Sequence, residues 1–307
     1  MFSIPFEGLL PSGFPSGRLD AALGYFLPHL GLRARRRLWK ECLVFVNGRA
    51  LPPGGPVKAG DVLRVEKKPA GAGGRRGAGV WRPVAVNGDY AVFDKPSGLH
   101  SAGLRGSDSP SLEALAATCP ECPGEMQFLS RLDFETSGLV PAALNSGAEE
   151  RFRLAERAGR VRKIYLGLAA GAICSPLLIK GRILAEGRGK SRVCGAEDAD
   201  PTRHSRVFPL LRISGALAGC AEAGEATLAR IEIGRGARHQ IRAHLAFAGH
   251  PLLGDRLYGG PERSVREGEP PFFLHHALLI LPGLEVRCPP PWIERFADRI
   301  PAGISII

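Results

Sequence analysis

Residues 130–138 read Ser-Arg-Leu-Asp-Phe-Glu-Thr-Ser-Gly, which places a carboxylate beside an arginine and ahead of a turn signal. Apolar residues resume at Leu139, so the pattern predicts a loop next to a buried strand, and loops held by a scaffold often carry chemistry. A nearby cation favours the charged form of a carboxylate. Asp133 could therefore act as a nucleophile or a base, although an aspartate can equally cap such a turn.

Net charge is the second informative property of the chain. Its 307 residues contain 41 Lys and Arg and 30 Asp and Glu, which leaves +11 at pH 7. Residues 18–68 hold 11 of the basic residues and 4 of the acidic ones, so a small part of the chain carries most of the surplus. Basic surfaces neutralise phosphate groups, and the charge therefore favours a nucleic acid as partner over simple solubility.

Composition divides the chain into four segments. The Gly- and Arg-rich residues 69–82 cannot bury apolar area and indicate a flexible linker. Residues 1–17 are set apart as an N-terminal extension, 18–68 as a small domain of two helices and short strands, and 83–307 as a second domain. Strand-like and helix-like segments alternate irregularly in the second domain, which predicts an α/β (α+β) fold with a mixed, mainly antiparallel sheet.

Four further blocks, together with residues 130–140, resemble the RluA-type pseudouridine synthases, which convert uridine to pseudouridine in RNA. These blocks are Val-Phe-Asp-Lys-Pro-Ser-Gly-Leu at 92–99, Lys-Ile-Tyr-Leu at 163–166, His-Gln-Ile-Arg-Ala-His-Leu at 239–245, and the long block at 249–259. The similarity covers roughly residues 83–300, in the order that the family requires. The resemblance implies the pseudouridine synthase fold and a redox-neutral isomerisation that needs no cofactor.

The resemblance also implies a role for each matching residue. Asp133 would start cleavage of the glycosidic bond, by attack on C1′ or by removal of a sugar proton, and the sequence does not choose between these roles. Tyr165 would face the base, and Arg242 would pair with Asp133. Arg131 would fill the gap left by a flipped base, with a phosphate contact or an ion pair as the alternative. Substrate binding is assigned to Arg131, Lys95, His239 and Gln240.

Residues 18–68 show a second resemblance, to the S-four type of RNA-binding domain. It rests on Arg-Leu-Asp at 18–20, the basic stretch at 33–38, Val-Phe-Val-Asn-Gly-Arg at 44–49 and Val-Lys-Ala-Gly-Asp-Val at 57–62. Members of that family bind structured RNA through a basic helix, whereas an arginine face that contacts only water is the alternative. RNA binding is assigned to Arg33, Arg35, Arg36, Arg37, Lys40 and Arg49.

Two departures from the RluA-type pattern affect the expected substrate more than the expected reaction. Ser130 stands where the family usually has histidine, so ring stacking and a titratable nitrogen are lost. Gly-Ala-Arg at 236–238 stands where the family usually has Gly-Arg-Thr. Neither change removes Asp133, Tyr165 or Arg242.

Other sequence features add no competing chemistry. Cys119 and Cys122 have a metal-like spacing, but no second ligand pair completes a zinc site, so no metal is expected. Gly-Lys-Ser at 189–191 lacks the first glycine of a phosphate-binding loop, and no serine has the setting of a hydrolase nucleophile. Seven scattered cysteines, no signal-peptide pattern and no membrane-spanning run favour a cytoplasmic protein without membrane contact. We expect a monomer, although no sequence feature addresses oligomeric state.

The sequence therefore predicts an RNA pseudouridine synthase that acts on ribosomal RNA or tRNA and carries a basic N-terminal RNA-binding domain. The alternative is a non-catalytic RNA-binding or ribosome-assembly factor on the same fold. Retention of Asp133, Tyr165 and Arg242 together argues against that alternative. A nucleoside glycosidase would break the same bond but would leave residues 18–68 unexplained.

Overall fold

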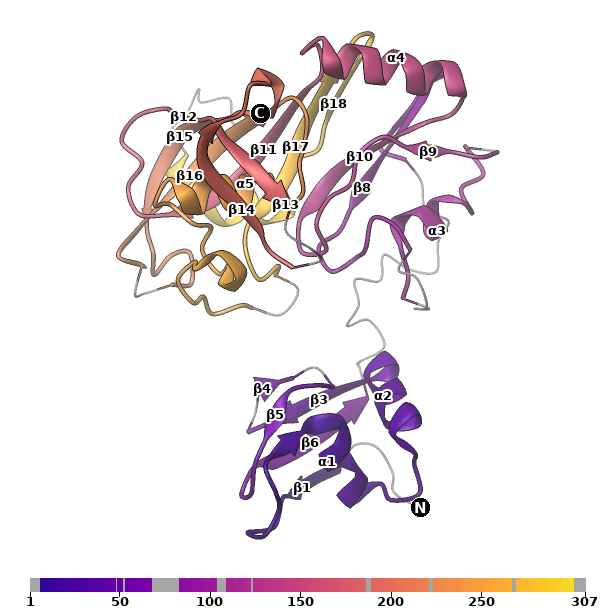
Figure 1. Ribbon diagram of the computed structural model, residues 1–307, viewed down its shortest axis with the longest axis vertical. Coiled ribbons are helices and arrows are strands. Elements are labelled where there is room, and N and C mark those ends of the chain that lie inside the picture. The colour runs from indigo at the N-terminus through magenta and orange to yellow at the C-terminus, as the bar shows by residue number, and fades with distance from the viewer. Residues whose placement is uncertain are drawn as a thin grey trace. The chain divides into compact units, whose positions relative to one another are not determined.

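The computed structural model describes residues 6–47, 49–51, 53–67, 83–103, 109–122, 124–185, 189–220, 223–266 and 269–300. The chain forms two compact units, Met1–Gly77 and Ala78–Ile307 (Figure 1). The stretch predicted as a linker, residues 69–82, lies outside the described residues. Within the described part of the chain, no helix has both the length and the apolar character needed to span a membrane.

The first unit is a small α/β unit built on a four-stranded sheet with the order β1-β6-β3-β4, while β2 pairs separately with β5. Its elements are β1 (Phe6–Leu9), β2 (Gly17–Arg18), α1 (Leu19–Phe26), α2 (Leu32–Glu41), β3 (Cys42–Val46), β4 (Arg49–Ala50), β5 (Pro56–Val57) and β6 (Val62–Lys67). Leu19 and Leu23 of α1 pack with Val44 and Val65 in its core. The helical spacing of apolar residues in α1 is thus explained by burial against the sheet.

Strand β1 changes one boundary of the sequence interpretation. It pairs antiparallel with β6 from Phe6↔Val65 to Leu9↔Val62, and Leu10 behind it is fully buried. An edge strand of four residues that follows a proline and contains a glycine shows too little alternation to be detected in a sequence. Residues 6–17 therefore belong to the first unit and are not a separate extension.

The second unit contains a ten-stranded mixed sheet, mainly antiparallel as predicted (Figure 1). Its order is β12-β15-β16-β11-β17-β10-β8-β7, with β18 beside β17 and β9 beside β10. Among the described strand pairs, β10 and β17 are the parallel one. The strands are β7 (Ala85–Val86), β8 (Tyr90–Lys95), β9 (Gln127–Phe128), β10 (Ser137–Ala143), β11 (Arg162–Ala170), β12 (Leu177–Ile179), β15 (Ser205–Ser214), β16 (Glu225–Ile233), β17 (Leu274–Leu281) and β18 (Leu284–Arg287). Strands β13 (Gly181–Ala185) and β14 (Ser191–Glu197) form a separate hairpin.

Helices pack their apolar residues onto this sheet. They are α3 (Leu112–Ala116), α4 (Ser146–Arg157) and α5 (Gln240–Phe247), with 3-10 turns at Pro201–Arg203, Arg256–Tyr258 and Pro291–Arg299. Phe152 of α4 packs in one cluster with Leu139 of β10. Ile241 of α5 packs in another cluster with Tyr165 of β11. Helix α5 therefore shares a hydrophobic cluster with the strand that carries the predicted base-facing tyrosine.

Gly138 shows why the turn after Asp133 ends in a glycine. Strand β10 runs beside β17 at the parallel pair Gly138↔His276, and a Cβ on Gly138 would lie 2.4 Å from the carbonyl oxygen of His276. The φ of Gly138, 109°, is also in the region that favours glycine. The close approach of these two strands sets the start of β10, and with it the loop that carries Asp133.

We predict that Gly138→Ala lowers the free energy of unfolding of the protein by about 1–3 kcal/mol, the usual cost of a strained backbone conformation. The loop before β10 should shift as well, so activity should also fall. Gly88→Ala is the matched control, because a Cβ there meets open space. Urea unfolding of both variants checks the prediction, and equal stabilities would contradict it.

Candidate active site

The predicted site residues of the second unit converge on one cavity of about 710 Å³. Residues from the loop before β10, from β11 and from the start of α5 line its walls. The cavity is lined by Arg131, Asp133, Tyr165, His239, Gln240 and Arg242, whereas Lys95 is not among the lining residues. Strand pairing explains the convergence, because β17 lies between β10 and β11 in the sheet.

Asp133 forms an ion pair with Arg242, and this pair continues to a second carboxylate. Nη1 of Arg242 lies 3.3 Å from Oδ2 of Asp133. Its Nε and Nη2 donate to the two carboxylate oxygens of Asp255 at 2.7 and 2.8 Å. The side chains of Arg242 and Asp255 are 6% and 1% exposed, against 22% for Asp133. Asp255 thus holds the inner edge of the guanidinium, and Asp133 is the carboxylate that the cavity can reach.

The surroundings of Arg242 keep it charged and oriented. Burial alone would lower the pKa of Arg242, but hydrogen bonds and charge from Asp255, followed by those of Asp133, raise it above its ordinary value. The guanidinium carbon lies 5.2 Å from the ring centre of Tyr258 and 4.6 Å from that of Phe272. A planar cation between two rings and two carboxylates has little freedom to turn. The orientation of Asp133 therefore depends on side chains that lie far from it in the sequence.

His239 links the predicted catalytic carboxylate to Tyr258. It precedes α5 with a left-handed backbone (φ 55°), which is unusual for a residue with a side chain. Its Nδ1 lies 3.0 Å from the hydroxyl of Tyr258, and its Nε2 lies 3.9 Å from Oδ1 of Asp133. Burial lowers the pKa of His239, with the charge of Asp133 opposing that effect. A neutral imidazole at the cavity wall follows for neutral pH.

Tyr165 is held against a second ring. Its ring centre lies 4.6 Å from that of His276, with an angle of 14° between the planes, so the two rings are stacked. His276 is fixed in turn, because its Nδ1 is 2.6 Å from the carbonyl oxygen of Leu139. Burial raises the pKa of the Tyr165 phenol, and the charge of Asp133 adds to the effect. The ring therefore stays protonated and in one orientation.

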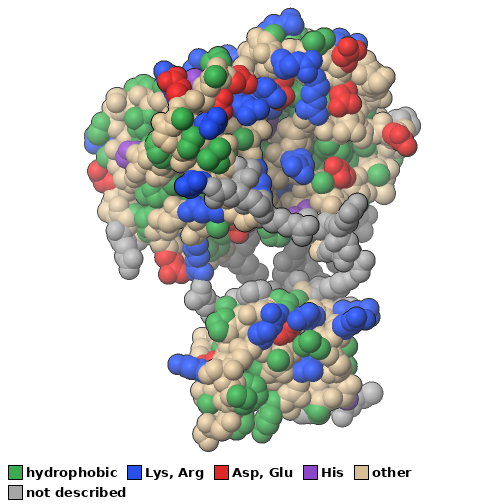
Figure 2. All heavy atoms as spheres, in the orientation of Figure 1, with side chains coloured by type: hydrophobic (Ala, Val, Ile, Leu, Met, Phe, Trp, Pro, Cys, Tyr) green, Lys and Arg blue, Asp and Glu red, His purple; other side chains and the backbone are tan. Residues whose placement is uncertain are grey.

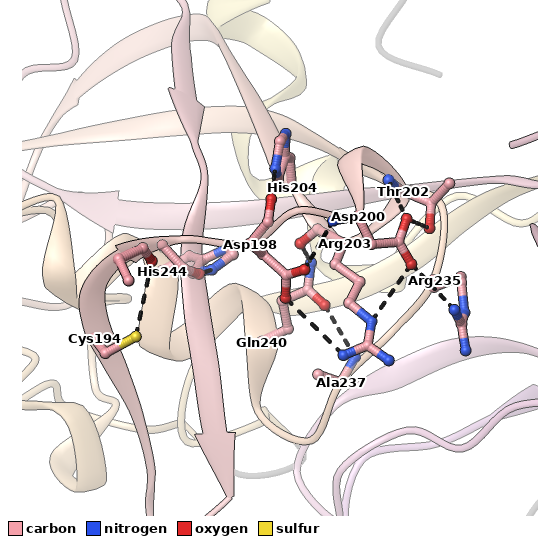
Figure 3. A network of polar contacts seen from close by, with 12 residues as sticks. Cys194, Asp198, Asp200, Thr202, Arg203, His204, Arg235, Ala237, Gln240 and His244 are labelled. Carbon is pink, nitrogen blue, oxygen red and sulfur yellow. Dashed lines mark hydrogen bonds and ion pairs between the residues drawn. The ribbon is translucent and has the colours of Figure 1, made fainter.

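Gln240 lines the cavity, but its amide is bound by the backbone around it. Its Oε1 accepts from the backbone N of Ala237 at 2.9 Å, and its Nε2 donates to the carbonyl of Arg203 at 2.6 Å. Figure 3 shows it in a polar network in which Asp200 meets both Arg203 and Arg235. These contacts tie the turn before α5 to the 3-10 turn at Pro201–Arg203. They support a positioning role, and substrate binding by Gln240 stays a prediction.

Lys95 is fully buried at the end of β8. Its Nζ donates to the carbonyls of Pro96 and Leu99 at 2.9 Å and to that of Phe134 at 3.3 Å. Burial lowers the pKa of Lys95 to about 8, with the charges of Asp133 and Asp94 opposing. The ammonium group therefore joins the loop after β8 to the loop that carries Asp133. In this arrangement it has no face open to a substrate, so the geometry does not support its assignment to substrate binding.

The two departures from the family pattern both lie at the cavity. Ser130, Ala237 and Arg238 line it together with the exposed Arg131. From this position the guanidinium of Arg131 can reach an RNA base or a phosphate, so both predicted roles for it stay open. Sequence changes at these positions would alter contacts with the substrate and leave the Asp133–Arg242 pair in place.

The basic helix of the first unit, α2, divides its arginines into two kinds. Arg35 donates to the carbonyl of Ala21 at 2.8 Å, and Arg36 donates to the buried carboxylate of Asp20 at 2.6 Å. Arg33 and Arg37 are exposed. Figure 2 shows Lys and Arg side chains gathered on the visible face of this unit. Lys40 lies in α2 and Arg49 in β4, but their side chains lie outside the described part of the structure.

One group of potential metal ligands lies away from the cavity. Asp94, His275 and Cys288 place one ligand atom each within 4.8 Å of one another. Both ring nitrogens of His275 already have hydrogen-bond partners, because Nδ1 lies 2.9 Å from Oγ of Ser137 and Nε2 lies 2.8 Å from the carbonyl oxygen of Cys288. As arranged, this histidine has no nitrogen available for a metal.

Sequence reasoning assigned no role to Asp255, Tyr258 or His276. Asp255 and Tyr258 lie in the Gly-Asp-Arg-Leu-Tyr-Gly part of the block at 249–259, so the block was found but not its contacts. His276 stacks on Tyr165, a contact that no local sequence pattern indicates. The presence of Asp255 and Tyr258 in one six-residue block was the available signal that this block contacts Arg242.

Comparison with known proteins identifies the family. The sequence profile of the RNA pseudouridylate synthases matches residues 89–247, and the chain belongs to this family. The chain is 31% identical over 264 residues to the ribosomal large subunit pseudouridine synthase D of Neisseria meningitidis serogroup A. The alignment covers 82% of this chain and 66% of that protein. The chain thus spans just under two thirds of that relative. An uncharacterized RNA pseudouridine synthase of Chloroflexus aurantiacus is 29% identical, over 97% of this chain and 91% of that one.

Solved structures agree on the fold. The human RNA pseudouridylate synthase domain containing 1 superposes with a TM-score of 0.52 at 24% sequence identity, over 69% of this chain and 84% of that one. The mixed, mainly antiparallel sheet of the second unit is therefore a pseudouridine synthase fold. The fold predicted for this part of the chain is confirmed.

We predict that Arg242→Ala lowers the free energy of unfolding by about 3–5 kcal/mol, because removing the cation leaves the buried charge of Asp255 unpaired. Asp255→Asn should also lower it strongly, because it removes the inner charge partner of Arg242. Arg256→Ala is the control, since Arg256 and Glu262 form an exposed ion pair, which is worth about 0–1 kcal/mol. Denaturant unfolding of the three variants measures the difference. If the Arg242 and Asp255 variants lose no more free energy of unfolding than the control does, the buried ion pair does not stabilise the folded protein as predicted.

Proposed function

We propose that this protein isomerises specific uridines of RNA to pseudouridine, with Asp133 as the catalytic carboxylate. The observation that carries the proposal is the ion pair of Asp133 with the buried Arg242, in a cavity that Tyr165 also lines. Membership of the RNA pseudouridylate synthase family supplies the reaction class. Ribosomal RNA is the proposed substrate, because several relatives are named as ribosomal large subunit enzymes; tRNA is the second candidate.

The proposed reaction breaks the bond between N1 of uracil and C1′ of ribose, rotates the base, and joins C5 to C1′. C5 loses its proton and N1 gains one, so the product is an isomer of the substrate. Asp133 starts this sequence by attack on C1′ or by removal of a sugar proton. Arg242 keeps the carboxylate oriented, because its other donors are bound to Asp255. Tyr165 supplies a fixed, protonated ring, which supports a role as stacking surface and hydrogen-bond donor rather than as a base.

The first unit is proposed to bind the RNA as an S-four-like domain. Its support is the basic helix α2, on which Arg33 and Arg37 are exposed, while Asp20 pairs with Arg36. Hydrogen bonds from Arg18 and Arg36 hold the pKa of Asp20 at about 2 against the effect of burial. Asp20 therefore stays ionised, and α2 keeps a fixed position on α1.

We also propose that the protein acts as a monomer in the cytoplasm. All seven cysteines are free thiols, which agrees with a reducing compartment. The predicted site residues that line the cavity lie in one unit of the chain, which is compatible with a monomer. A non-catalytic RNA-binding factor on the same fold remains the alternative function, and it needs no ionised carboxylate in the cavity.

Asp133→Ala and Asp133→Asn should abolish release of tritium from RNA labelled at uridine C5, because no other carboxylate lines the cavity near Arg242 in the described structure except Glu156, which pairs with Lys163. The substrate is total RNA from cells that lack the protein, which avoids RNA that is already modified. RNA binding by both variants should remain within about threefold of wild type, since removing one cavity carboxylate deletes no cation that contacts phosphate.

Tritium release by the wild-type protein and by Asp133→Ala alike would remove Asp133 from catalysis. Absence of release even with the wild-type protein, together with retained RNA binding, would instead favour the non-catalytic factor.

Removal of the exposed arginines of α2 should weaken RNA binding without changing the chemistry. For Arg33→Gln with Arg37→Gln, the slope of log binding constant against log salt concentration should become less steep by about 0.7–0.9 for each arginine that contacts a phosphate. Arg157→Gln, an exposed arginine of α4, is the matched control. Filter binding at several salt concentrations provides the measurement. Equal slopes for the α2 variant and the wild-type protein would refute a role of α2 in RNA binding.

A further inference from the structure

A second group of charges lines the cavity apart from Asp133 and Arg242. Oε1 of Glu156 on α4 accepts a hydrogen bond from Nζ of Lys163 on β11 at 2.6 Å. Its Oε2 lies 4.0 Å from Nη1 of Arg153 and 4.0 Å from Nε of Arg235. One carboxylate therefore gathers three cations, which come from α4, from β11 and from the loop between β16 and α5.

These cations differ in what they can reach. The side chains of Lys163 and Glu156 are 3% and 11% exposed, whereas those of Arg153 and Arg235 are 36% and 35% exposed. Lys163 neutralises Glu156 in the interior. The two arginines are left with donors that a ligand in the cavity can reach.

Each arginine is also held from outside the group. Arg153 donates through Nη1 to the carbonyl of Leu129 at 2.8 Å, and its Nη2 lies 3.6 Å from Oε1 of Glu149. Arg235 donates through Nη1 to Asp200 at 3.1 Å. A guanidinium has five N–H donors, so these bonds orient the side chains and leave other donors for a ligand. Asp200 and Glu149 offset part of the charge, but neither lines the cavity.

The charge of the cavity wall is strongly one-sided. Its lining contains six cationic side chains and two carboxylates: Arg131, Arg153, Lys163, Arg235, Arg238 and Arg242 against Asp133 and Glu156. Figure 2 shows Lys and Arg side chains along a hollow in the visible face of the second unit. A surplus of this kind attracts a polyanion more than the neutral uracil ring.

The position of the group relative to Tyr165 suits one nucleotide. Lys163 and Tyr165 are two residues apart on β11, and both line the cavity. Residues at this spacing share a face of the strand and lie about 6.6 Å apart. The charged group around Glu156 therefore lines the same cavity as the ring that is predicted to face the base, at a neighbouring position along β11.

We propose that Arg153 and Arg235 bind a backbone phosphate of the RNA next to the target uridine, and that Glu156 positions them. The guanidinium group suits this role, because its planar donors match phosphate oxygens in pairs. The inference rests on the proposed function, since it takes the nucleotide to be the one whose ribose faces Asp133. The phosphate is a diester of the RNA chain and not a free ion, because the same cavity must hold the adjoining sugar and base.

The competing explanation is an ion-pair network that only stabilises the packing of α4 on the sheet. The two explanations differ in what removal of an arginine changes. A phosphate contact alters the KM for RNA and the salt dependence of binding. A packing contact alters the melting temperature and leaves the salt dependence as it was.

The test compares Arg153→Gln and Arg235→Gln with Arg157→Gln, which removes an exposed arginine from the same helix as Arg153. The probe is C5-tritiated ribosomal RNA transcribed in vitro, which carries no modification beforehand. Each cavity variant should raise the KM for RNA roughly threefold to tenfold. The slope of log binding constant against log salt concentration should become less steep by about 0.7–0.9. The loss should lie in KM, with kcat at saturating RNA within about twofold of wild type.

The subsite is ruled out if both cavity variants match Arg157→Gln in KM and in salt dependence. It is also ruled out if they lower only the melting temperature. A wild-type protein that releases no tritium from this probe or from total RNA would overturn the proposed function instead. Salt-dependent RNA binding by the same variants would still decide on the phosphate subsite in that case, so the two failures are distinguishable.

Discussion

A buried guanidinium between two carboxylates is the interaction on which the site depends. Arg242 is almost completely enclosed, and a cation in that position requires charged partners to remain in the folded state. Asp255 supplies two hydrogen bonds from the interior, and Asp133 supplies one contact from the cavity side. Asp255 fixes the guanidinium of Arg242, and Arg242 then fixes Asp133. The carboxylate proposed to be catalytic is thus held from the side opposite to the cavity.

The sheet provides the frame for this arrangement. Because β17 lies between β10 and β11, it places the loop before β10 and the ring of Tyr165 at one cavity. The parallel approach of β10 to β17 requires a glycine at position 138, and His276 at the same point of β17 stacks on Tyr165. Lys95 adds a buried link from β8 to the same loop. Several strands therefore contribute to the position of a single carboxylate.

We propose that two groups of basic residues contribute to RNA binding in different ways. The exposed arginines of α2 lie on a surface, where attraction to RNA acts at a distance and falls with salt. The arginines around Glu156 lie in the cavity wall, where partial burial and fixed hydrogen bonds favour contact with one phosphate. In both places a buried carboxylate holds neighbouring cations, Asp20 in the first unit and Glu156 in the second.

From the sequence by itself we predicted the family, the mixed, mainly antiparallel fold and the pairing of Asp133 with Arg242, because contiguous blocks of residue types carry that information. It did not show that residues 6–9 form an edge strand, since four residues hold too little periodicity. It also could not show that Lys95 and the amide of Gln240 are bound by the protein itself, or that Asp255, His276 and Glu156 support the site. Those facts concern side chains far apart in the chain, and only the tertiary structure decides which of them meet, how deeply they are buried and which donors remain for a substrate.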